Sequence, residues 1–198
     1  MKEVISGRFT PQRKAIGVND KFGNVGIKKQ QGSTVIKYDS LPLDGRTEYR
    51  FFEGSSQRNF PLSNTGSDGN KLGVGNTLVL ERAYLSIVLF GEGGAISEIE
   101  VLSLATTNAN ILASEFSFSI ANSEVIKQVP ILSWLPQFNK VAENEVNTNF
   151  EFDTQVVIPP LLEYVATLRL PAGVTSRDAF LRLTVEGTGA IIAPRTTF

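Results

Sequence analysis

Paired carboxylates are the first residues of this chain that could do chemistry. Glu98 and Glu100 are two residues apart, and so are Glu151 and Asp153. In a β-strand such neighbours share one face, because successive side chains point to opposite faces. Two carboxylates on one face could serve as the acid and base of a glycoside hydrolase, or as calcium ligands. A solvated strand face also needs polar residues at alternate positions, and we favour that simpler interpretation.

The chain of 198 residues contains neither His nor Cys. Without these side chains, Ser–His–Asp and Cys–His catalysis is impossible, and so are zinc sites built on imidazole or thiolate. An enzyme would have to use carboxylates, Lys, Tyr or a bound cofactor. We therefore predict no enzymatic activity, no metal site and no cofactor.

The segment 63–70 has the Asn, Asp, Ser and Gly composition of a calcium loop. However, Asp68 is its only charged residue, and it lacks the bidentate Glu that closes an EF-hand loop. The same residue types are common in tight turns, so we expect a turn here.

The segment 132–138 contains the only Trp of the chain. Trp is an effective anchor at protein interfaces, which makes Trp134, Leu135 and Phe138 candidates for a contact between subunits. Two alternatives stay open. The indole could cap the end of the protein core, or it could form part of an aromatic platform for a sugar.

The elements that must position these residues are predicted to be β-strands. Apolar and polar residues alternate with a period of two at 115–120, where Phe116, Phe118 and Ile120 share one face. Further strands are expected at 48–52, 77–90, 95–104, 150–158, 163–170, 179–186 and 190–193. Residues 123–129 could form a short helix or an edge strand.

One-sided alternation favours antiparallel sheets with one face in a core. About eight strands without a long helix predict an all-β fold, an antiparallel sandwich of jelly-roll or immunoglobulin type. Two long connections, at 54–76 and 132–149, favour the jelly roll with about eight strands. The most apolar stretch, 77–90, is shorter than the ~20 residues of a spanning helix, so we expect no transmembrane segment. The N-terminus shows no apolar region typical of a signal peptide.

Charge is distributed unevenly along the chain. Residues 1–37 carry eight Lys or Arg and two acids, a net of +6, whereas the other 161 residues carry eleven and eighteen, a net of −7. Glycines and a proline interrupt the basic segment, which predicts an extended N-terminal arm (1–37) ahead of a β-sandwich domain (38–198). The charges that could contact phosphates, lipid head groups or an acidic neighbour are Arg8, Arg13, Lys14, Lys21, Lys28 and Lys29.

This pattern resembles the jelly-roll capsid proteins of icosahedral viruses, especially bacteriophages. A basic arm precedes about eight strands, and three C-terminal stretches resemble the closing strands of such a sandwich: 156–160 (Val-Val-Ile-Pro-Pro), 164–171 (Tyr-Val-Ala-Thr-Leu-Arg-Leu-Pro) and 181–187 (Leu-Arg-Leu-Thr-Val-Glu-Gly). The likeness is one of architecture and carries over no catalytic residue.

The resemblance implies a viral structural protein that is made in the host cytoplasm and resides in the virion. It would assemble with itself into a trimer, pentamer or larger shell, as a major, vertex or minor subunit, and would contact other capsid proteins. Its arm would tie to neighbouring subunits or face the particle interior, where it could contact nucleic acid or lipid. The alternative is a carbohydrate- or receptor-binding sandwich, such as a phage spike or a lectin-like module, that uses Trp134, Tyr49 and Tyr84.

Overall fold

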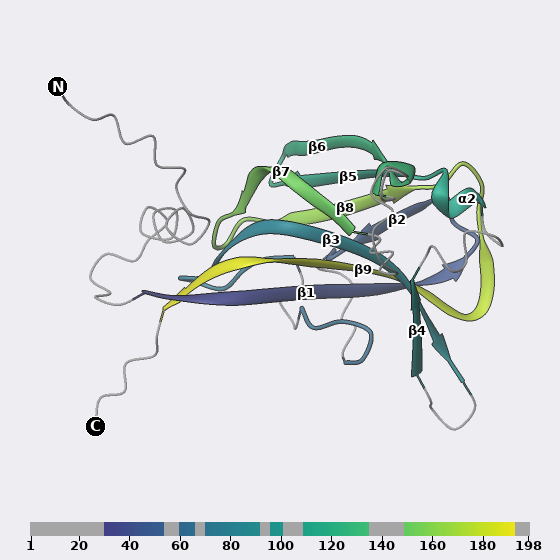
Figure 1. Ribbon diagram of the computed structural model, residues 1–198. Coiled ribbons are helices and arrows are strands. Elements are labelled where there is room, and N and C mark those ends of the chain that lie inside the picture. The colour runs from purple at the N-terminus through teal and green to yellow at the C-terminus, as the bar shows by residue number, and fades with distance from the viewer. Residues whose placement is uncertain are drawn as a thin grey trace, which may run out of the picture.

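The computed structural model describes residues 30–53, 60–65, 70–91, 96–100, 109–134 and 149–192, without the side chains of 30, 31, 98–100, 149, 153, 191 and 192. Within these residues the chain forms nine β-strands in two antiparallel sheets, and two helices of only four residues each. The sheets face each other across a shared core (Figure 1). The predicted all-β antiparallel sandwich is therefore confirmed.

Sheet A is built around two long strands that run side by side, β3 and β9. β1 covers the outer edge of β9, while the far edge of β3 pairs first with β7 and then with β4. Its strands are β1 (Gln30–Asp44), β3 (Thr77–Phe90), β4 (Ile96–Glu100), β7 (Asn149–Ile158) and β9 (Thr175–Ile192).

Sheet B has four strands in the order β2-β8-β5-β6. They are β2 (Glu48–Phe51), β5 (Glu115–Ile120), β6 (Ser123–Pro130) and β8 (Tyr164–Arg169). The short helices α2 (Ala109–Leu112) and η2 (Ile131–Trp134) flank β5 and β6 along the chain. No helix among the described residues is long and apolar enough to cross a membrane.

The strand pairs are nested along the chain. When β4 is set aside, the first strand pairs with the last (β1 with β9), the second with the seventh (β2 with β8), the third with the sixth (β3 with β7) and the fourth with the fifth (β5 with β6). One long antiparallel hairpin of eight strands, rolled up so that its halves face each other, has this pairing. β4 is an addition: it forms a hairpin with the end of β3 that projects from the body (Figure 1).

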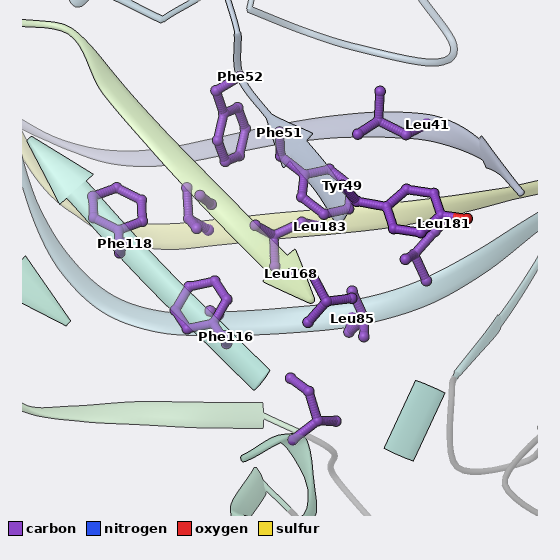
Figure 2. Packing of buried hydrophobic residues seen from close by; sticks show 14 of the residues in the cluster. Leu41, Tyr49, Phe51, Phe52, Leu85, Phe116, Phe118, Leu168, Leu181 and Leu183 are labelled. Carbon is purple, nitrogen blue, oxygen red and sulfur yellow. The ribbon is translucent and has the colours of Figure 1, made fainter. Parts of the chain in front are cut away.

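The core lies between the two sheets and follows the predicted alternation. Phe116 and Phe118 of β5 are fully buried, and so are Leu181 and Leu183 of β9 on the opposite sheet. Figure 2 shows these side chains meeting across the gap, with the aromatic residues of β2 beside them. Burial of each such side chain contributes about 1.5–3 kcal/mol, so this layer is the main stabilising feature of the fold.

β1 lies where no strand was expected. Residues 30–37, which the sequence placed in the arm, form the first half of β1, and β1 continues to Asp44. Its register with β9 gives Lys37 and Asp39 the same orientation as the core residue Leu41. Two charged residues on the inward face interrupt the apolar alternation, which is why the pattern does not predict a strand.

Asp39 is 1% exposed and joins β1 to the end of β2. Its Oδ2 accepts a hydrogen bond from the backbone N of Phe52 at 2.8 Å. Phe52 has a φ of 64°, a conformation that costs a non-glycine residue free energy. Since a buried carboxylate needs partners, the bond stabilises both residues at once. Burial, together with the nearby Asp39 charge, raises the pKa of the packed phenol of Tyr164.

β9 is one strand of 18 residues, although glycines at 187 and 189 suggested two strands. Glu81 is an extra residue in β3, because Leu80 lies opposite Gly187 and Arg82 lies opposite Glu186. At this bulge the backbones approach so closely that a Cβ on Gly187 would lie 1.9 Å from the carbonyl O of Val79. Gly187 therefore allows the strand to continue past the bulge.

We predict that Gly187→Ala destabilises the protein by about 1–3 kcal/mol, because the new methyl group would meet backbone atoms that cannot move aside. Gly73→Ala is the matched control, since its Cβ would come no closer than 3.3 Å, to the flexible side chain of Asn76. Denaturant unfolding measures both variants. Equal stability of the two would contradict the close approach.

Candidate functional site

The outer face of sheet A, away from the core, carries a network of polar side chains around the β3 bulge. Tyr84 donates a hydrogen bond to Glu186, and Thr188 donates one to Glu81 at 2.5 Å. Burial and the bond to Glu186 raise the pKa of Tyr84. Each carboxylate here is paired with a hydroxyl group, an arrangement that ties β3 to β9.

Of the two predicted carboxylate pairs, only the side chain of Glu151 lies in the described part of the structure. The side chain of Glu151 is 72% exposed and lies 4.0 Å from Arg82 on the neighbouring strand. The side chains of Asp153, Glu98 and Glu100 are outside the described part of the structure. Among the residues that are described, no three acidic side chains gather to hold a metal ion. Glu151 is thus a solvated residue of a strand face, as the simpler interpretation predicted.

Trp134 belongs to the core of this chain. It is 4% exposed, stacks on Phe150 at 5.5 Å between ring centroids, and meets Phe116 edge-on at 5.1 Å. Its Nε1 has no hydrogen-bond partner in the described structure. This burial supports the core-capping alternative and leaves no exposed indole face for a sugar. Leu135 and Phe138 lie outside the described residues.

The free edge of β1 is partly covered by the segment 60–65, which follows β2 after residues outside the description. Asn64 bonds to this edge as a strand would. Its Oδ1 accepts from the backbone N of Tyr38, its Nδ2 donates to the carbonyl O of Ile36, both at 2.8 Å, and its backbone N donates to the carbonyl O of Tyr38. One side chain thus satisfies backbone groups on two residues of an edge strand. We name residues 60–65 the edge clasp.

Arg182 of β9 anchors the edge clasp to the outer face. Its Nη2 donates to the carbonyl O of Pro61 at 2.7 Å, and its Nε donates to Ser40 Oγ at 3.0 Å. Its guanidinium also lies 4.7 Å from the ring centroid of Tyr38, within the range of a cation–π contact. The clasp is therefore held by charge-assisted bonds as well as by backbone bonds.

β6, an edge strand of sheet B, is shaped differently. Its pairing with β5 shifts twice, between Phe116 and Phe118 and between Phe118 and Ser119. Gln128 has a φ of 46°, and Glu124 and Lys127 are exposed. Bulges and charges of this kind hinder the addition of another strand.

The basic residues predicted to contact partners (Arg8, Arg13, Lys14, Lys21, Lys28 and Lys29) all lie outside the described residues. The sequence reasoning missed the clasp, which depends on Asn64, Ser40 and Arg182. The only signal was the Ser-Asn pair at 63–64, which we interpreted as part of a turn.

Comparison of the chain with protein-family models, with curated proteins and with solved structures finds no significant match.

We predict that Trp134→Ala lowers the free energy of unfolding by about 3–5 kcal/mol, because it removes a buried aromatic side chain. Leu132→Ala, in the same short helix but 53% exposed, is the control and should cost less than about 0.5 kcal/mol. Thermal or denaturant unfolding measures both. Similar small losses for the two variants would place the indole outside the core.

We predict that Asn64→Ala accelerates hydrogen exchange at the amide of Tyr38, because that amide loses its acceptor. The amide of Leu41 is the internal control, because in the unbroken β1–β9 register odd-numbered residues point their backbone groups toward β9. Amide exchange measured by NMR resolves the two sites. Unchanged exchange at Tyr38 would contradict the clasp.

Proposed function

We propose that this protein is a jelly-roll subunit of an icosahedral viral shell, and that it acts by assembling with copies of itself. The observation that carries the proposal is the nested strand pairing, with sheets ordered β1-β9-β3-β7 and β2-β8-β5-β6. A double-sheet jelly roll of eight strands has such an arrangement, and viral capsid proteins are prominent among its users.

The surface supports a structural role more than a chemical one. On the outer face, Glu186 and Glu81 are hydrogen-bonded to hydroxyl groups, and Glu151 lies 4.0 Å from the guanidinium of Arg82. The chain has no His, so a jelly roll with an imidazole metal site is excluded. Fold alone does not establish function, so these side chains matter beside the architecture.

The alternative, a carbohydrate- or receptor-binding module, has less support. Trp134 and Tyr49, two of its three proposed aromatic residues, are 4% and 0% exposed. A sugar stacks on an accessible ring face, which neither offers. Tyr84 is partly buried and bonded to Glu186.

In this proposed shell the basic arm binds a partner of opposite charge. The six basic residues named above, Arg8, Arg13, Lys14, Lys21, Lys28 and Lys29, would contact an acidic neighbouring subunit, the genome or lipid head groups inside the particle. Since β1 begins at Gln30, the arm in this proposal comprises residues 1–29. The protein would reside in the virion beside other capsid proteins, as a major, vertex or minor component.

We predict that Arg13→Gln with Lys14→Gln, and separately Lys28→Gln with Lys29→Gln, reduces either particle yield or the nucleic acid retained in particles. Lys127→Gln with Arg177→Gln removes the same charge from exposed sites of the sandwich and should change neither. Sedimentation velocity measures assembly, and absorbance at two wavelengths measures the nucleic acid content.

The effect should be largest at low ionic strength and shrink as salt is added, because a variant with fewer phosphate contacts has a shallower salt dependence. A normal particle yield and a normal nucleic acid content in every arm variant would contradict the role proposed for the arm. A wild-type chain that stays monomeric under all conditions would overturn the proposed function itself.

A further inference from the structure

The first part of β1 is an edge of sheet A that no other described strand covers. The bonds to Asn64 show that Ile36 and Tyr38 direct their backbone groups away from β9. The register between β1 and β9 is unbroken from Gln30 to Pro42, and the direction of backbone groups alternates along such a ladder. Gln30, Gly32 and Thr34 must therefore also present N–H and C=O groups at the free edge. Within the described residues, no segment pairs with this edge before Ile36.

This edge has none of the features that protect β6. Residues 30–36 (Gln-Gln-Gly-Ser-Thr-Val-Ile) contain no charge and no proline, and no bulge interrupts them. Natural edge strands usually avoid addition by means of charges, prolines, bulges or a covering loop. The chain uses such means on β6 and, with the edge clasp, on residues 36–39 of β1. Residues 30–35 have no charge, proline or bulge, and no described segment covers them.

Exposed apolar side chains lie beside the open edge. Ile36 is 49% exposed and Phe60, the first residue of the clasp, is 84% exposed. Asn64 bonds to Ile36, so the clasp brings these apolar groups to the same margin of sheet A. In Figure 1 the start of β1 and the end of β9 extend beyond the strands of sheet B.

We propose that residues 31–35 of β1 pair antiparallel with the same residues of a second copy, across a two-fold axis at Ser33 that sets Gly32 of each copy opposite Thr34 of the other, so that sheet A continues from one subunit into the next. The inference rests on the proposed function and names one of its contacts.

A second copy fits this edge for two reasons. An antiparallel pair of identical strands is self-complementary under a two-fold axis, because each residue meets its counterpart in the reverse direction. A segment without charge can also meet itself without repulsion between like charges. Ile36 and Phe60 of both copies would flank the paired strands and bury apolar surface, as interface cores require.

Thr34→Pro in the full-length chain tests the pairing. Proline removes the N–H that faces the free edge and leaves the bonds to β9 in place, and edge strands tolerate it on that side. We expect the concentration needed for assembly to rise by about tenfold or more, because hydrogen bonds across the interface are lost. Thr34→Val, which keeps the N–H, should assemble as the wild type does.

A second measurement does not depend on the effect of proline on folding. The chain has no Cys, so Thr34→Cys introduces a single thiol beside the proposed axis, and Glu124→Cys introduces one on the protected edge. A short bis-maleimide linker should convert Thr34→Cys particles to covalent dimers in much higher yield than Glu124→Cys particles.

The outcomes separate the two proposals. If the wild type assembles, and Thr34→Pro assembles equally well or Thr34→Cys gives no more dimer than Glu124→Cys, the edge pairing is overturned while the shell function stands. If the wild type does not assemble, the shell function fails first.

Discussion

The pairing of β9 with both β1 and β3 is the interaction on which the rest of the fold depends. It joins Gln30 to Ile192, so the first and last described strands lie side by side as the outermost pair of the nested pattern. The β9 register also decides which residues enter the core: Leu181, Leu183 and Val185 face inward, and a slip by one residue would turn all three toward solvent. Because these contacts are distant in sequence, sheet A needs nearly the whole chain before it can form.

Sheet edges connect this fold to the assembly that we propose. A sandwich with open sheets has four edges, and every edge exposes backbone groups that favour contact with another strand. Here β6 is interrupted by bulges, and part of β1 is bonded to Asn64 and held down by Arg182. The backbone N–H and C=O groups of Gly32 and Thr34 that face away from β9 pair with no described strand. A protein that functions alone gains nothing from such an edge, whereas a shell subunit requires surfaces that bind further copies.

The sequence predicted those strands whose neighbours impose a simple alternation. Phe116 and Phe118 in β5, like Tyr164 and Ala166 in β8, pack on one core face, and a period of two is therefore visible in the sequence. β1 was missed because Lys37 and Asp39 face inward, where burial lowers the pKa of Lys37 and Asp39 holds the backbone of Phe52. Local patterns do not reveal such partners, since Phe52 is 13 residues away and Asn64 bonds to backbone groups 26 and 28 residues away. Trp134 was left with three interpretations for the same reason: its burial depends on Phe150, across an intervening segment.

We propose that the nested strands build a subunit of a closed shell. Electron microscopy of the purified full-length chain, over a range of protein concentrations and salt, tests it most directly. We expect closed particles of uniform size in which 21.6 kDa two-sheet subunits repeat with symmetry. A field of dispersed single subunits at every concentration, with no particles in any salt condition, would contradict it.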